Sequence, residues 1–126
     1  EAARVVCAVP RRRLEVRGGE VSKGVTQRDR AVIGAATAVA ESLPDADGPL
    51  TVQVIRTSAG PLVIEVNARL GGGYPLSAHA GAPTLRWAVQ RALGLPRQPS
   101  EFAWADRTLM LRYDRSVIVP DWDPEA

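Results

Sequence analysis

The chain has 126 residues, a formal net charge of +2 and one cysteine, Cys7. This length suits a single domain with its own core, and a lone cysteine excludes an intrachain disulfide. We expect Cys7 to pack inside a strand. No apolar run reaches about 18 residues and no segment resembles a secretory signal, which argues against a membrane partner and favours the cytoplasm.

The basic residues are almost all arginine, with Lys23 the only lysine. Nucleic-acid-binding modules use clustered arginines with exposed aromatic residues between them. The arginines here are dispersed, and aromatic residues make up only 5% of the chain. The one triplet, residues 11–13, would point to both faces of a strand. A basic nucleic-acid-binding module is therefore the weakest of our functional hypotheses.

The N-terminal part of the chain predicts strands. Residues 4–9 and 13–17 fit two strands that meet near Pro10. Gly18 and Gly19 predict a turn after them, and residues 20–25 predict a loop or short extended segment.

A helix follows. Thr26, with Asp29 three residues later, resembles a capping box in which Asp replaces the usual Glu or Gln. A helix is therefore expected from Thr26 to about Leu43, and the apolar positions along it form one core-facing stripe. Residues 44–48 predict a loop.

The strongest pattern in the chain predicts a β-hairpin over residues 50–69. Two runs of alternating apolar and polar residues are separated by Ser58, Ala59 and Gly60. Three-residue hairpin loops often end with a left-handed glycine, and Gly60 occupies that position. Pro61 then begins the second strand, where a missing N–H is tolerated.

The length of this loop sets the expected register. If Thr57 pairs with Pro61, Gln53 lies directly opposite Glu65, with Cβ atoms about 4.5–5.5 Å apart. The same count turns four apolar side chains toward the core, namely Val52, Val54, Ile64 and Val66. A slip of one residue would move all of them to the other face.

The opposite face of the hairpin carries a polar row. Glu65, Asn67 and Arg69 alternate with apolar residues, about 6.6 Å apart along an extended strand. Carboxylate and amide oxygens suit Mg²⁺, and a fixed cation suits phosphoryl oxygens. A solvated strand face is the ordinary alternative. The run Gly71, Gly72, Gly73 favours a site, since such glycines usually permit close approach of the backbone to another group; a flexible turn is the rival interpretation.

The remaining residues predict two helices and a last hairpin. Residues 74–80 fit a short helix, and Pro83 opens a second helix that runs to Leu93 before Gly94. The loop that follows, 95–105, offers Phe102 and Trp104 for packing. Residues 107–113 and 116–119 fit a final hairpin, and residues 121–126 a frayed tail.

Residues 64–69, with the upstream Val52–Gln53–Val54 and the following Gly-Gly-Gly-Tyr-Pro-Leu-Ser, resemble the metal-binding hairpin of the ATP-grasp superfamily. The branch they resemble contains the carbamoyl-phosphate synthase large chain and the ATP-dependent carboxylate–amine ligases. The resemblance covers residues 3–113 and is weaker over 12–26 and 110–113. Two positions depart from it, since the family commonly has Pro in place of Ala68 and often an acidic residue in place of Gln53.

The resemblance implies an α+β fold, the ATP-grasp C-terminal subdomain, with a mostly antiparallel sheet and two main helices. Residues 1–126 would be a single domain and the C-terminal portion of an ATP-grasp unit in a longer chain. The N-terminal half of the unit, which supplies adenine contacts, a Gly-rich loop and a phosphate-binding Lys, would be its partner. On this interpretation the isolated piece is inactive. No Walker-type phosphate loop is present.

The resemblance also implies the chemistry. ATP and Mg²⁺ or Mn²⁺ would activate a small-molecule carboxylate or bicarbonate as an acyl phosphate, which an amine or ammonia then attacks. Glu65, Asn67 and Gln53 would hold the metal, with Gln53 and Glu65 also serving the nucleotide. Arg69 would be the catalytic cation that holds the reacting group, and the backbone of Gly71, Gly72 and Gly73 would approach the substrate. Lys23 would contact the nucleotide, with a solvated lysine as the rival interpretation.

A degenerate, non-catalytic ATP-grasp module for assembly or regulation is the main alternative function. The departures at Gln53 and Ala68 leave room for it, because a neutral first ligand binds a cation less strongly. The identity of the substrates and the oligomeric state, a homo-oligomer included, stay open.

Overall fold

The fold is α+β, as expected. The computed structural model describes residues 4–96, 103–121 and 123. The strands are β1 (Arg11–Arg17), β2 (Glu20–Thr26), β3 (Thr51–Thr57), β4 (Gly60–Asn67) and β5 (Leu109–Leu111). The helices are α1 (Arg30–Ser42), α2 (Tyr74–His79) and α3 (Thr84–Ala92). The helical expectations for 26–43, 74–80 and 83–93 are thus confirmed apart from their boundaries.

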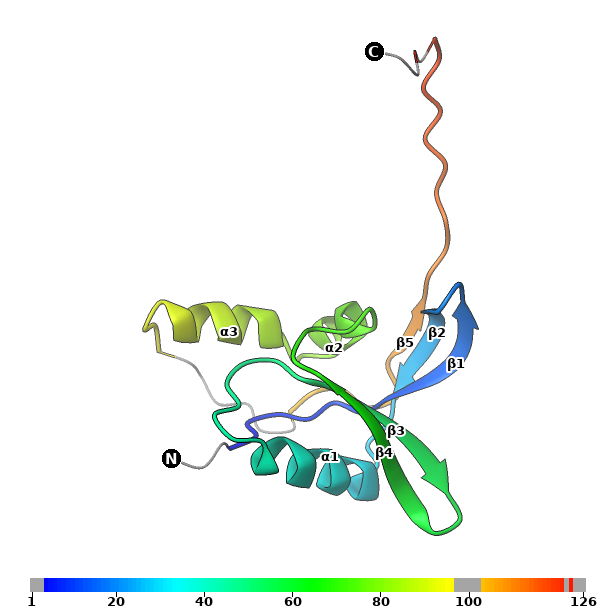
Figure 1. Cartoon of the computed structure of the whole chain (residues 1–126). Helices are drawn as coiled ribbons and strands as arrows, with labels where there is room; N and C mark the ends of the chain where they lie inside the picture. The colour runs from blue at the N-terminus through cyan, green and yellow to red at the C-terminus, as the bar shows by residue number, and fades with distance from the viewer. Residues whose placement is uncertain (1–3, 97–102, 122, 124–126) are drawn as a thin grey trace.

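The strands form two antiparallel sheets within the described residues. One sheet has the order β1-β2-β5, and β3 pairs with β4 in the other. Helix α1 contacts both strands of the β3–β4 hairpin, and α2 contacts β2. In Figure 1 the hairpin leaves the body of the protein as a ribbon, while the chain after β5 extends away from the body.

One expectation for the N-terminal strands is wrong, because residues 4–10 are not in a strand and the first strand begins at Arg11. Of the two alternatives left open for residues 20–25, the extended segment is correct, and it forms a full seven-residue strand over residues 20–26. The reason is long-range, because β2 is the central strand of its sheet and is bonded on one side by β1 and on the other by β5. Gly18 and Gly19 form the expected turn, both with positive φ.

Helix α1 begins later than the capping-box pattern predicts. Asp29 is the N-cap, and its Oδ1 accepts from the backbone N–H groups of Ala31 at 3.0 Å and Val32 at 3.2 Å. Its second oxygen, Oδ2, pairs with Arg56 of β3 at 3.3 Å. The same carboxylate therefore starts the helix and ties it to the hairpin.

Thr26, expected to cap the helix, is instead the fully buried last residue of β2. Its hydroxyl donates to the Ala105 carbonyl at 2.8 Å and accepts from the Thr108 N–H at 2.9 Å. Its own N–H and C=O bond to the Thr108 carbonyl and the Arg107 N–H, at 3.0 and 2.9 Å. Thr26 thus fastens the segment before β5 to the central strand.

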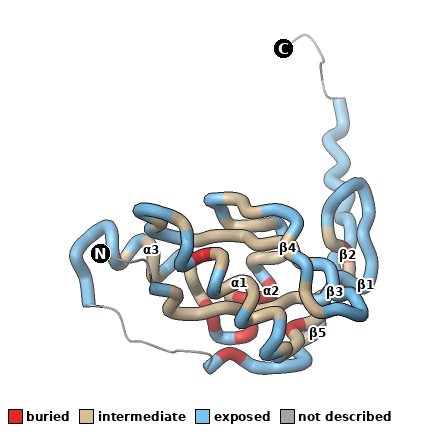
Figure 2. The backbone as a smooth tube through the Cα atoms, turned by 60° about the horizontal axis from the view of Figure 1, so that its bottom comes forward, coloured by how far each residue is buried: buried red, intermediate tan, exposed pale blue. Residues whose placement is uncertain are grey.

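The small core lies beside this junction. Its buried members are Ala80, Ala82 and Trp104, with Cys7, Val9, Ile33 and Trp87 packed around them. Figure 2 shows that few parts of the chain are buried. The indole of Trp104 donates to the Ala8 carbonyl at 3.0 Å, so the packing predicted for Trp104 is confirmed. Cys7 packs here as expected but outside any strand, and Phe102 lies outside the described residues.

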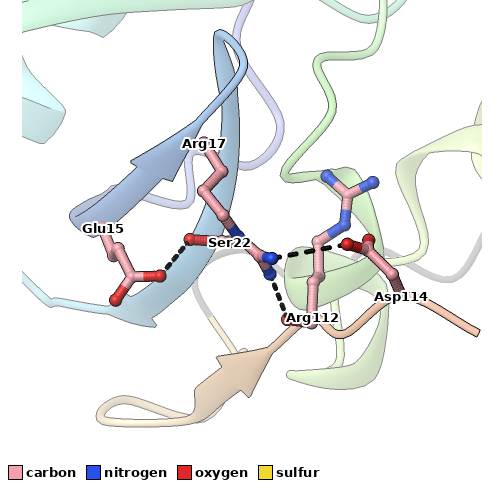
Figure 3. A network of polar contacts seen from close by, with 5 residues as sticks. All are labelled: Glu15, Arg17, Ser22, Arg112 and Asp114. Atoms are coloured by element: carbon pink, nitrogen blue, oxygen red, sulfur yellow. Dashed lines mark hydrogen bonds and ion pairs between the residues drawn. The ribbon is translucent and has the colours of Figure 1, made fainter.

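The C-terminal segment does not form the expected hairpin. Residues 109–111 pair with β2, and residues 116–119 are in no strand. Beyond β5, Arg17 of β1 holds the chain through the Arg112 carbonyl at 3.3 Å and the Asp114 carboxylate at 3.4 Å (Figure 3). The predicted frayed tail, 121–126, lies mostly outside the described residues. Among the described residues, no helix is long and apolar enough to cross a membrane.

We expect Thr26→Val to lower the free energy of unfolding by about 1–3 kcal/mol, because the isosteric change leaves two partners at a partly buried junction, the Ala105 carbonyl and the Thr108 N–H, without the hydroxyl. Urea denaturation measures this. Thr108→Val is the matched control, since the Thr108 hydroxyl makes only a 3.4 Å contact to the Ala105 carbonyl, and its effect should be within about 0.5 kcal/mol. Equal losses in the two variants would contradict the role assigned to Thr26.

Candidate functional site

The hairpin brings Gln53 directly opposite Glu65, as predicted. The route to this pairing differs from the expected one. Thr57 pairs with Gly60 and not with Pro61, so the loop has two residues, Ser58 and Ala59. A β-bulge between Val54 and Gln53 then adds one residue on β4, and this restores the pairing.

The bulge also changes which side chains face the core. Ile64 was expected to point inward, but it is 52% exposed. Val63 is partly buried in its place, together with Val52, Val54 and Val66. The expectation for Ile64 is therefore wrong, because one inserted residue reverses the alternation of side chains on one side of the bulge.

The polar side chains of the hairpin converge on one carboxylate. The Gln53 amide donates through Nε2 to Glu65 Oε2. Asn67, two residues along β4, donates through Nδ2 to Glu65 Oε1 at 2.9 Å. Both oxygens of Glu65 are therefore engaged by amide groups. The other end of the Gln53 amide, Oε1, accepts from Arg13 of β1 at 3.2 Å, which links the two sheets.

Arg69 does not continue the polar row along the strand. Strand β4 ends at Asn67, and the Arg69 N–H turns back to the Asn67 carbonyl at 2.8 Å. The exposed Arg69 guanidinium bonds to the neighbouring Leu70 carbonyl at 3.2 Å, and its own carbonyl accepts from the Thr51 hydroxyl at 2.7 Å. Arg69 thus lies in a bend just beyond the Glu65 cluster, with its charge toward solvent.

The three glycines after this bend lie close to side chains of the protein itself. A Cβ on Gly71 would lie 3.1 Å from Thr51, and one on Gly73 would lie 3.3 Å from Arg11 Nε. A Cβ on Gly72 would clash with the Glu20 carboxylate. None of the three has a positive φ, so glycine is needed here for close approach and not for an unusual turn.

The comparison with known families settles the relationship of the chain. The family described as "ATP-grasp in the biosynthetic pathway with Ter operon" matches residues 1–113. The chain belongs to this ATP-grasp family. ATP-grasp proteins are ATP-binding, ligase-type enzymes, and the carbamoyl-phosphate synthase-like branch is not confirmed. No curated protein matches the chain.

The β3–β4 hairpin carries oxygen donors that fit a hard cation. Glu65 offers two carboxylate oxygens, and Gln53 and Asn67 each offer one amide oxygen, which are donors that Mg²⁺ accepts. Both amides now direct N–H groups at Glu65, so each would have to rotate to present its oxygen. The set contains one anion only, and no group of three His, Cys, Asp or Glu side chains is gathered elsewhere among the described residues.

Lys23 lies on β2, within the segment for which a loop and an extended piece were both left open. It forms an ion pair with Glu15 of β1 at 3.4 Å, and both side chains are about half exposed. Ser22 donates to the other Glu15 oxygen at 2.7 Å (Figure 3). The hydrogen bond from Ser22 lowers the pKa of Glu15, and the charge of Lys23 lowers it further. Lys23 is thus paired with Glu15, whereas Glu65 is bonded to Gln53 and Asn67.

Two arginines near the ATP-grasp hairpin were missed by the sequence reasoning. Arg11 and Arg13 share one face of β1, and Arg12 lies on the other. Arg13 bonds to Gln53, while the half-buried Arg11 donates to the Ser77 hydroxyl at 2.7 Å. Burial lowers the pKa of Arg11, and the charge of Arg13 lowers it further. The alternation of side chains along a strand is enough to indicate that Arg11 and Arg13 share one face of β1, but only the fold places these two residues against the hairpin and α2.

We expect Gly71→Ala to destabilise the protein by about 1 kcal/mol or more, because the new methyl group overpacks against a β-branched side chain that cannot easily turn away. Chemical denaturation is the measurement. Gly34→Ala is the control: a Cβ there meets nothing within 4 Å on α1, so it should stabilise by about 0.5–1 kcal/mol. If both variants gain stability, the contact between Gly71 and Thr51 is not tight.

Proposed function

We propose that the chain carries the metal-binding hairpin of a ligase that uses ATP and Mg²⁺, or Mn²⁺, to activate a carboxylate or bicarbonate. The γ-phosphoryl group passes to a carboxylate oxygen and ADP leaves. An amine or ammonia then attacks the carbonyl carbon of the acyl phosphate, and phosphate leaves. The observation that carries this proposal is the convergence of Gln53 and Asn67 on the Glu65 carboxylate.

In this proposal the three residues hold the metal. Glu65 supplies the charge and has enough oxygens for two cations, while Gln53 and Asn67 complete the coordination after their amides rotate. Bound metal would neutralise the charge that builds on the phosphoryl oxygens. Arg13, which now occupies Gln53 Oε1, must leave that oxygen when a cation takes it.

Arg69 is the group that we assign to the reacting anion. Its guanidinium is exposed and bonded only to a neighbouring carbonyl among the described residues, so it can turn toward a ligand at little cost. A planar fork of donors matches the oxygens of a carboxylate or acyl phosphate. The adjoining backbone of Gly71, Gly72 and Gly73 then lies along the substrate.

The remaining contacts belong to the proposed N-terminal half of the unit. That half would supply the adenine contacts and most phosphate contacts, so we expect this piece alone to bind ATP weakly. Lys23 reaches the nucleotide only if Glu15 releases it.

A degenerate module is the second candidate, and one observation favours it. The Glu65 oxygens and the Gln53 oxygen are all satisfied by protein donors. Such a closed network is stable without a cation, as a domain kept for assembly or regulation would require.

Glu65→Gln in the full-length protein should lower ATP turnover by on the order of 10²-fold or more, because it removes the single anion of the ligand set. The measurement is steady-state hydrolysis and ligation across a Mg²⁺ titration. Glu41→Gln is the control, since Gln can still accept the Val5 N–H that Glu41 holds at 3.0 Å. Near-normal turnover of Glu65→Gln at saturating Mg²⁺ would favour the degenerate module.

Arg69→Ala should cost on the order of 10²–10³ in rate, by analogy with the loss of one preorganised donor to a developing charge. Arg69→Lys should recover little of this, because an ammonium is a point charge and not a fork. Both variants should keep the wild-type stability, since the Arg69 side chain is exposed. Full recovery by Lys would show that only charge is needed.

A further inference from the structure

A cavity of about 800 Å³ lies next to the proposed site. Its walls come from the N-terminal segment, α1, β3, α2 and α3. This volume falls within the range of roughly 300–1,000 Å³ that is typical of small-molecule pockets. The walls combine apolar residues, among them Val9, Leu50 and Trp87, with polar groups, among them Arg11 and Ser77.

Arg11 brings an uncompensated positive charge to this cavity. Its side chain is half buried and bonds to the Ser77 hydroxyl. Among the residues that the structure describes, no carboxylate forms an ion pair with it. The cavity-lining Asp47 is paired with Arg91 at 2.7 Å instead. Because a guanidinium stays protonated in proteins, burial does not remove the charge but makes an anionic partner favourable.

Ser77 makes this corner of the cavity a two-point anion site. Its side chain is buried, at 2% exposed, and its Oγ accepts the bond from Arg11. The hydroxyl hydrogen has no acceptor among the described residues. It is therefore available to donate to the same anion that the Arg11 fork would bind.

The cavity also adjoins Arg69. Thr51, Leu70 and Gly71 line it. Thr51 and Leu70 are the residues that bond to the Arg69 backbone carbonyl and guanidinium. The lining thus includes Arg11 and also the residues that flank or bond to Arg69.

We propose that this cavity binds a dicarboxylic acid substrate, with one carboxylate held by Arg11 and Ser77 and an apolar linker against the walls. The second carboxylate extends toward Arg69 and is the one that is activated. This inference rests on the proposed function and names its substrate class. The lining carries the carboxylates of Asp45 and Asp47 beside its arginines, which disfavours a highly charged polyphosphate, and its apolar members can contact the linker of an organic acid.

The test is a titration of the full chain with adipate, a dicarboxylate with an apolar linker, in EDTA and at constant ionic strength. NMR signals of the Arg11 Nε–H and the Gly73 amide report binding. We expect saturable shifts in wild type and at least about a tenfold weaker affinity in Arg11→Met, because a bond to a charged group is lost. Arg11→Lys, which keeps the charge but not the fork, should lose most of the affinity as well.

Arg12→Met is the matched control, because Arg12 lies on the opposite face of β1, and it should bind adipate as wild type does. Thermal unfolding of each variant shows whether it is folded. Non-saturable shifts, unchanged affinity in a folded Arg11→Met, or tighter binding of inorganic phosphate than of adipate would each overturn the proposal. Glu65→Gln should leave adipate binding in EDTA unchanged, so a failed metal site and a failed substrate pocket are distinguishable.

Discussion

The hydrogen bonds of Thr26 join strand β2 to residues 105–108, which lie about 80 positions further along the chain. All of its polar groups bond to residues 105–108, and these bonds place Trp104 in the core and β5 beside β2. Arg107 adopts a left-handed conformation with φ of 57° within this turn. Such a conformation costs a non-glycine residue about 1–2 kcal/mol, and it persists because the flanking bonds to Thr26 leave the chain no relaxed alternative.

The candidate site depends on a different constraint, the bulge in β4. A two-residue loop alone would bring Gln53 opposite Ile64 and turn the polar row away from its partner. The extra residue at the bulge corrects this offset, so that both amides reach Glu65. Helix α1 supports the arrangement through contacts with both strands of the hairpin and through the Asp29–Arg56 ion pair.

Local patterns were enough to predict the hairpin and the helices, because alternation and glycine or proline positions are properties of neighbouring residues. The predicted pairing of Gln53 with Glu65 is also present, but it arises from a two-residue loop and a bulge that the sequence pattern did not indicate. Local patterns were not enough where a distant partner decides the outcome. For residues 20–25 they left a loop and an extended segment open, and the segment is a strand because β2 pairs with β1 on one side and with β5 on the other. A Cβ placed on Gly24 of β2 would lie 3.6 Å from the Leu76 side chain of α2. The residues around Gly24 in the sequence do not predict this close packing. The Arg11–Ser77 contact joins residues 66 positions apart, so only the fold could place Arg11 at the site.

The bond from Arg13 to Gln53 is the direct side-chain link between the β1-β2-β5 sheet and the hairpin at the Glu65 cluster. If the hairpin binds a cation as we propose, a cation on Gln53 Oε1 and the Arg13 guanidinium would compete for the same oxygen and repel each other. Metal affinity and the Arg13–Gln53 contact would then be thermodynamically linked, and each would weaken the other by the same factor. Binding of the cation would free the Arg13 guanidinium for an anion that accompanies the metal.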